Sequence, residues 1–156
     1  MSKKLFSLVV SVFAIVFVFF ACDQLPVDKL PEADNNELSG YWKSSFGDGF
    51  DLSGDTYTQY DDADKHVSFA GTFDESTDLT QSSLYLTIKI TDGGTWFKTV
   101  GYYYTIHFKN IRAGTCQMSA AYKDSGLSDA SSDDIANEEF TVANGYFGFY
   151  SDCVKQ

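Results

Sequence analysis

Two cysteines in the C-terminal half of the chain have the side chains for thiol chemistry. Cys116 shares its position in an alternating pattern with Met118. Cys153 shares the parity of Phe147 and Phe149, so both thiols are expected to point inward from late strands. A disulfide between them would close a loop of about 38 residues and stabilise the fold by roughly 4 kcal/mol. Two buried free thiols are the alternative.

The histidines and carboxylates show no spacing typical of a catalytic or metal site. His66 follows an acidic turn, and the parity of His107 places it on the wet face of a strand. Neither has a second histidine or a cysteine at zinc-ligand spacing. The aspartates of residues 61–64 and 129–134 could surround a calcium ion, but they lack EF-hand spacing and are more typical of solvated turns. The chain also lacks a nucleophile elbow and a Walker loop. We expect no enzyme activity, catalytic residue, metal or cofactor.

The N-terminal sequence is typical of an export signal. Lys3 and Lys4 precede an uncharged, apolar run over residues 5–20, and Ala21 then stands before Cys22. A basic start, an apolar run and a small residue before the cleavage point are typical of a secretory signal peptide. The run is shorter than the roughly 20 residues of a spanning helix. Export would place the thiols where disulfides form.

The end of this signal is the run Phe19-Phe20-Ala21-Cys22. It resembles the lipobox of bacterial lipoproteins, in the looser form of spirochaete-type lipoproteins. The resemblance implies that Cys22 becomes the new N-terminus and carries acyl chains, each buried methylene contributing about 0.8 kcal/mol. The expected location is the cell envelope, with the protein lipid-anchored to a bacterial membrane, the outer membrane by preference, on its periplasmic or surface face. An ordinary signal peptide and an uncleaved anchor are the alternatives.

The net charge of the exported chain limits the classes of partner that it can bind. Nine of the eleven basic residues and all 22 acidic residues follow Cys22, so this portion has a formal charge of −13. Such a charge repels phosphate backbones and anionic headgroups, which argues against nucleic-acid binding. Residues 22–39 contain both prolines and no apolar period, and they are expected to form a flexible linker after the signal peptide of residues 1–21.

In residues 40–156, apolar side chains recur at every second position, as they do in β-strands. Alternating apolar residues run from Leu84 to Ile90 and from Tyr102 to Phe108, which predicts strands with one buried and one wet face. Shorter alternations occur at Trp42/Ser44/Phe46, Tyr57/Gln59, Val67/Phe69, Cys116/Met118, Phe140/Val142 and Phe147/Phe149. Turn signals separate them, which predicts a single all-β, antiparallel up-and-down barrel of eight or nine strands. Residues 131–139 are the one helical candidate, with Ser131 as its N-cap.

The domain opens on Gly40-Tyr41-Trp42. This tripeptide resembles the Gly-x-Trp signature of lipocalins and their calycin relatives, which implies a barrel that holds a small apolar ligand. In calycins a basic residue from a late strand stacks over this tryptophan, and Lys155 is the candidate here. The start Gly40-Tyr41-Trp42-Lys43-Ser44 and the aromatic ending before Cys153 also resemble small spirochaete-type lipoproteins, a likeness that bears on fold and location only.

Two functions remain open. The first is binding of a small apolar or amphipathic molecule inside the barrel, lined by aromatic residues. The expected lining is Trp42, Phe46, Phe69, Tyr102, Tyr104, Phe108 and Phe149. The second is a structural or interaction lipoprotein with a filled barrel, which meets a host or envelope protein partner through Tyr41, Tyr85 and Tyr103. Interior volume decides between them, because small barrels are either packed solid or hold one ligand.

Overall fold

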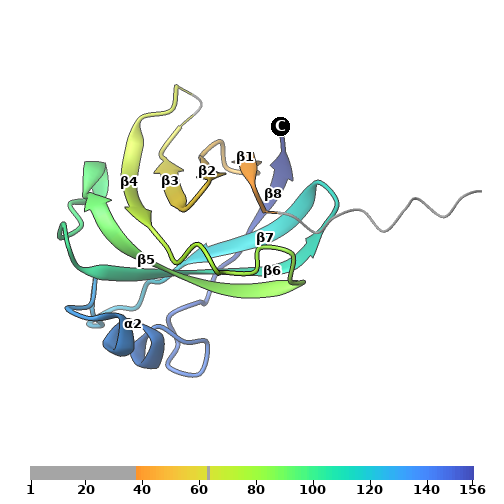
Figure 1. The fold of residues 1–156 in the computed structure, drawn as a ribbon. Helices are drawn as coiled ribbons and strands as arrows, with labels where there is room; N and C mark the ends of the chain where they lie inside the picture. Colours follow the sequence, from red (N-terminus) through yellow and green to blue (C-terminus); the bar gives the residue numbers. More distant parts are fainter. Residues whose placement is uncertain (1–37, 63) are drawn as a thin grey trace, which may run out of the picture. The chain divides into compact units, whose positions relative to one another are not determined.

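Residues 38–62 and 64–156, which the computed structural model describes, form eight antiparallel strands and one short helix (Figure 1). The elements are β1 (Gly40–Ser44), β2 (Gly49–Ser53), β3 (Thr56–Tyr60), β4 (Val67–Thr72), β5 (Ser83–Asp92), the 3-10 turn η1 (Gly94–Trp96), β6 (Tyr103–Arg112), β7 (Thr115–Ala120), α2 (Asp133–Glu139) and β8 (Ser151–Lys155). The predicted signal peptide, the lipidation site at Cys22 and nearly all of the predicted linker lie outside the described residues.

The strands close into a barrel in which each pairs with its neighbours in sequence. The closing pair is β1 with β8, where Trp42 stands opposite Lys155 and Ser44 opposite Cys153. This arrangement confirms the predicted up-and-down all-β barrel and fixes the number of strands at eight. Closure pairs the edge strands with each other, which removes the exposed edges that favour aggregation.

Up-and-down topology divides the connections between two ends of the barrel. The β1–β2, β3–β4, β5–β6 and β7–β8 connections meet at one end, which we call the mouth. The β2–β3, β4–β5 and β6–β7 connections meet at the other end, the floor, together with Leu38 and the C-terminus. Most connections are short, but residues 121–150 between β7 and β8 are long and carry α2.

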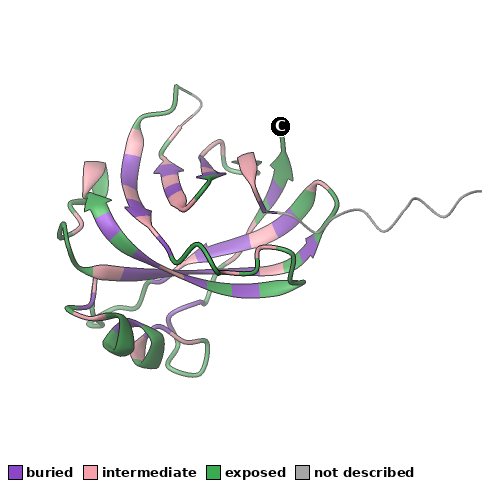
Figure 2. Cartoon of the chain, in the orientation of Figure 1, coloured by how far each residue is buried: buried purple, intermediate pink, exposed green. Residues whose placement is uncertain are grey.

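The inward-facing side chains of the two long strands, β5 and β6, are buried at every second position, as the sequence predicts. Along β5, buried Leu84, Leu86, Ile88 and Ile90 alternate with more exposed residues (Figure 2). In β6, Tyr104, Ile106 and Phe108 are buried and face the interior. The outer face of β6 differs from the prediction, because Thr105 and His107 are buried as well. The long β7–β8 connection covers them: Thr87 hydrogen-bonds Thr105 and Asn137 of α2, at 2.9 and 2.7 Å.

Aromatic side chains pack against one another in the interior of the barrel. Trp42 stacks on Phe50 with ring centroids 5.8 Å apart, and Phe50 continues to Tyr57 at 5.9 Å and Phe108 at 5.2 Å. All four residues are fully buried. At the floor, Trp42 donates its indole N–H to Leu38 O at 2.8 Å, so core packing begins before Gly40. Lys155 places its ammonium 5.8 Å from the Trp42 ring, in the position proposed for the stacking basic residue.

The helix and the late strands differ in detail from the prediction. Helix α2 begins at Asp133, and its N-cap is Ser132, one residue after the expected Ser131. The Ser132 hydroxyl accepts from Ile135 N at 3.3 Å. The alternation at Phe140 and Val142 marks no strand. Phe140 is the C-cap of α2, buried by the barrel, and Val142 is exposed in the following turns. The last strand begins only at Ser151.

Candidate functional site

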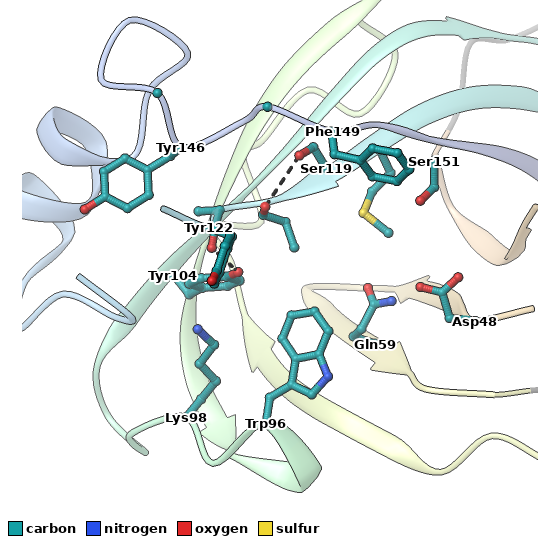
Figure 3. A pocket seen from close by; sticks show the side chains of 15 residues that line it. Asp48, Gln59, Trp96, Lys98, Tyr104, Ser119, Tyr122, Tyr146, Phe149 and Ser151 are labelled. Atoms are coloured by element: carbon teal, nitrogen blue, oxygen red, sulfur yellow. Dashed lines mark hydrogen bonds between the residues drawn. The ribbon is translucent and has the colours of Figure 1, made fainter. Parts of the chain in front are cut away.

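A pocket of about 420 Å³ opens at the mouth of the barrel (Figure 3). Its wall comes from the strand ends and from the connections that meet there. The lining residues are Asp48, Gln59, Trp96, Lys98, Tyr104, Met118, Ser119, Ala120, Ala121, Tyr122, Gly145, Tyr146, Gly148, Phe149 and Ser151. The barrel is therefore packed solid toward the floor and hollow toward the mouth.

Side-chain size explains why the hollow lies at this end. The inward positions nearest the mouth on β1 and β8 are occupied by Ser44 and Ser151, where the floor half of the barrel has Trp42 and other rings. The Ser44 hydroxyl donates to the side chain of Asp48 in the β1–β2 turn. Short side chains in a barrel of fixed diameter leave volume unfilled, and both Ser151 and Asp48, the hydrogen-bond partner of Ser44, line the pocket.

The polar groups at the base of the pocket are held in place. Tyr57 donates its hydroxyl to the side-chain oxygen of Gln59, which lines the pocket and is buried. Tyr104 donates its hydroxyl to Ala121 O at 2.6 Å. Burial raises the pKa of both tyrosines, so each hydroxyl keeps its proton and remains a donor. Among the described residues, every buried side-chain nitrogen and oxygen has a hydrogen-bond partner.

The β5–β6 connection places Trp96 over the pocket. Gly94 has φ +48°, and a Cβ atom there would collide with the Ser68 carbonyl oxygen, so the tight approach of this turn to β4 requires glycine. The Trp96 indole N–H donates to Asp61 at 3.0 Å, and its ring lies 5.2 Å from that of Phe69. Burial alone would raise the pKa of Asp61, but hydrogen bonds from Ser68, Thr95 and Trp96 outweigh it and lower the pKa.

Lys98, from the same connection, is the one cation in the lining of this pocket. Its ammonium lies 3.8 Å from the centroid of the Tyr104 ring and donates to Ser128 O. Burial lowers the pKa of Lys98 to about 8, although the Asp129 carboxylate acts in the opposite direction. Figure 3 shows Lys98 pointing toward Tyr104, next to Trp96. Lys98 therefore brings a partly desolvated positive charge to an aromatic wall.

Residues 145–150, which we call the strap, form the wall opposite Trp96 before the chain enters β8. Tyr146, Gly148 and Phe149 line the pocket, whereas Phe147 and Tyr150 face the outer surface of β6. The two sides of one short segment thus serve the pocket and the barrel exterior.

His107 lies beneath the strap on the exterior. It stacks on Tyr85 at 4.0 Å, its Nδ1 is 2.5 Å from the Tyr150 hydroxyl oxygen, and its Nε2 is 3.2 Å from Ser83 Oγ. Burial, followed by the Lys109 charge, lowers the pKa of His107. The prediction of a solvent-exposed His107 was wrong, because parity identifies the outer face but does not reveal a later segment that covers it.

The structure separates the seven residues expected to line a ligand site. Tyr104 and Phe149 line the pocket. Trp42, Phe69 and Phe108 point inward but are packed in the core below it.

The other two, Phe46 and Tyr102, lie outside the interior, 69% and 40% exposed. Phe46 belongs to the β1–β2 turn and Tyr102 precedes β6, so the strand alternation no longer fixes their direction. Phe46 instead meets Phe149 at the rim, with ring centroids 5.5 Å apart.

The tyrosines expected to meet a protein partner are each engaged with a neighbour. Tyr41 lies under the Lys65 ammonium at 3.8 Å. Tyr85 stacks on His107, and Tyr103 pairs with Ala130 through two backbone hydrogen bonds of 2.8 Å. The most exposed aromatic side chain in the described part of the chain is Phe97, 91% exposed beside Trp96.

Cys116 and Cys153 stand directly opposite each other on β7 and β8, and both are buried as predicted. Both are free thiols, so the disulfide is not formed in this structure. The neighbouring Cys153 side chain, followed by burial, raises the pKa of Cys116 and keeps it protonated. Directly paired residues of antiparallel strands have Cα atoms about 4.5–5.5 Å apart, within the range that a disulfide spans.

The acidic side chains of these turns contact other groups of the protein. Within residues 38–62 and 64–156, no group of three or more potential ligands is placed to hold a metal ion. Asp62 instead forms an ion pair with His66 at 2.8 Å, and Asp129 accepts from Thr99 N at 2.8 Å. Asp133 and Asp134 occupy the first turn of α2, where negative charge is favourable.

Sequence reasoning missed Trp96, Lys98 and Gln59 as pocket residues. The sequence predicts only a turn for the segment that carries Trp96 and Lys98, and Gln59 stands out only by its alternation with Tyr57. One signal was available: a tryptophan and a lysine in a connection at the mouth of an up-and-down barrel.

No helix among the described residues is long and apolar enough to cross a membrane. Comparison of the chain with family models, curated proteins and solved structures found no match.

Proposed function

We propose that this protein is a lipid-anchored envelope protein that binds one small amphipathic molecule in the pocket at the mouth of its barrel. The observation that carries the proposal is a hollow of about 420 Å³ in a barrel that is otherwise filled by aromatic side chains. Ligand pockets commonly measure about 300–1,000 Å³ and combine an apolar wall with a few fixed polar groups.

The lining matches that description. Trp96, Tyr104, Met118 and Phe149 supply apolar and aromatic surface. Gln59 and Lys98 supply polar contacts from opposite parts of the wall, and Gln59 is held by Tyr57. A filled core below the pocket limits the ligand to the mouth half of the barrel, so the ligand is short or remains partly exposed.

The anchoring part of the proposal rests on the N-terminal sequence. The apolar run and Cys22 resemble a lipoprotein signal, and acyl chains on Cys22 would hold the barrel at a membrane surface. A membrane offers a concentrated source of amphipathic molecules, which suits a pocket of this chemistry.

The test is saturable binding of N-phenyl-1-naphthylamine, a neutral apolar fluorophore, to the purified full-length protein. We expect micromolar binding that quenches Trp96, and Phe149→Ala should weaken it. Phe97→Ala is the matched control, since Phe97 is an exposed mouth aromatic that does not line the pocket. Because all variants share one N-terminus, probe bound to the signal segment cancels. Equal binding by both variants, or no saturable binding, would contradict the proposal.

A second candidate function is favoured by the rim of the mouth. Phe97, Tyr122 and Phe46 are 91%, 73% and 69% exposed there. Aromatic residues are enriched in protein–protein interfaces. If the probe does not bind, an interaction lipoprotein that uses this rim is the remaining function.

A further inference from the structure

A second hollow of about 380 Å³ lies beside the pocket. The two share Trp96, Lys98, Ala121 and Tyr122 in their walls. The second hollow is otherwise formed by residues 123–128 of the β7–β8 connection. Lys98 therefore stands on the boundary between an aromatic compartment and a compartment made of a polar loop.

Two positive charges border this second hollow. Lys98 and Lys123 both belong to its lining, and the Lys123 ammonium lies 5.3 Å from the centroid of the Tyr146 ring. The single carboxylate in the same lining, Asp124, accepts the Tyr122 hydroxyl at 2.7 Å. After residue 22 the chain has nine basic and 22 acidic residues, so two lysines beside one hollow oppose the overall charge.

The contacts of Lys98 leave capacity for a ligand. A lysine ammonium has three N–H donors. Ser128 O accepts one of them, and the Tyr104 ring faces the charge at 3.8 Å. The Asp129 carboxylate, whose charge acts on Lys98, accepts from Thr99 N at 2.8 Å. With one N–H donating to Ser128 O and another directed at the Tyr104 ring, one N–H donor of Lys98 remains for an anionic group at the boundary of the hollows.

From this geometry we infer that the ligand is an amphipathic anion, with its apolar body in the aromatic pocket and its anionic head in the second hollow, beside Lys98 and Lys123. This inference rests on the proposed function and specifies its ligand class. The head is a carboxylate or a phosphate, since both present oxygens that accept from an ammonium.

The state of Lys98 supports the same assignment. Burial lowers the pKa of Lys98 to about 8, so holding the charge at neutral pH costs free energy in the empty pocket. A bound anion would favour the charged form and raise that pKa. Binding of an anion should therefore weaken as the pH rises above about 8, whereas binding of a neutral ligand should not.

The experiment is displacement of N-phenyl-1-naphthylamine from the full-length protein by three compounds of equal chain length: dodecanoate, dodecyl phosphate and dodecan-1-ol. We expect the anions to bind about 10–100-fold more tightly than the alcohol, the range for charged hydrogen bonds. Lys98→Met should remove this difference, and Lys98→Arg should retain most of it. Lys43→Met is the matched control, because Lys43 is exposed on β1 and lines neither hollow.

The outcomes separate the two claims. If dodecan-1-ol displaces the probe as well as the anions do, or Lys98→Met keeps the preference, the anionic head is refuted while the pocket stands. If the probe itself does not bind, the proposed function is refuted. A preference for only one of the two anions supports the inference and identifies the head. The pH dependence gives an independent check, since a flat anion affinity from pH 7 to 9.5 would contradict a role for Lys98.

Discussion

Replacing Phe69 with alanine tests how the packed core supports the pocket. Phe69 is fully buried and its ring contacts those of Tyr57, Trp96 and Tyr104 at 5.8, 5.2 and 5.3 Å. Removing a buried phenylalanine ring costs about 3–5 kcal/mol, because transfer free energy is lost and a cavity remains. With a urea m-value of about 1.5–2 kcal/mol/M, the unfolding midpoint should fall by roughly 2 M.

The assay is equilibrium urea unfolding followed by circular dichroism at 222 nm. Phe97→Ala is the control, with an expected change within about 0.5 kcal/mol because that ring is 91% exposed. Phe69→Ala should also weaken probe binding, since Trp96 loses the ring on which it rests. A loss below about 1 kcal/mol at unchanged m-value would mean that Phe69 is not packed between these rings, and the division into a solid core and a hollow mouth would fail.

Three other predictions concern the N-terminus, the strap and the thiols. In the native bacterium, labelled palmitate should mark the protein and Cys22→Ser should abolish the label, and a labelled mutant would contradict lipidation. The lowered pKa of His107 makes the unfolded state bind more protons, so the free energy of unfolding should fall as the pH drops below about 6.5. His107→Gln should remove this dependence on pH. His66, whose pKa is raised by Asp62, should make the opposite contribution, which stabilises the fold as the pH falls. Mild oxidation should join Cys116 and Cys153, and mass spectrometry should find the linked peptides without unfolding, whereas two alkylatable thiols would contradict the pairing.

The strands were predictable where a side chain's direction is set by its own strand. Apolar residues alternate along the sequence of β5 and β6, which predicts the inward residues from Leu84 to Ile90 and from Tyr104 to Phe108. The position of Lys155 over Trp42 followed from the resemblance to calycins, and the register of β1 with β8 places it there. The sequence does not predict β2, because Gly47 and Gly49 are typical of a turn and because Phe50 and Leu52 are too few to show a period.

The pocket and the covered histidine depend on contacts between distant segments. His107 is buried by Tyr150 and Phe147, and no local pattern around His107 announces them. The pocket is lined by residues from several strands and connections, which come together only once the barrel has closed. Phe46 and Tyr102 failed as lining residues because alternation does not show where a strand ends.

The pairing of β1 with β8 has a consequence for how the chain reaches its native state. The other pairings join strands that follow one another, but the closing pair joins Trp42 to Lys155, more than one hundred positions away. The chain entropy lost in closing so long a loop is recovered only when the final ladder forms. Refolding should therefore be slow for a chain of this size, on the millisecond-to-second scale of barrels rich in non-local contacts. Trp42 lies in that closing pair, so the indole emission of Trp42 should report the last step of assembly.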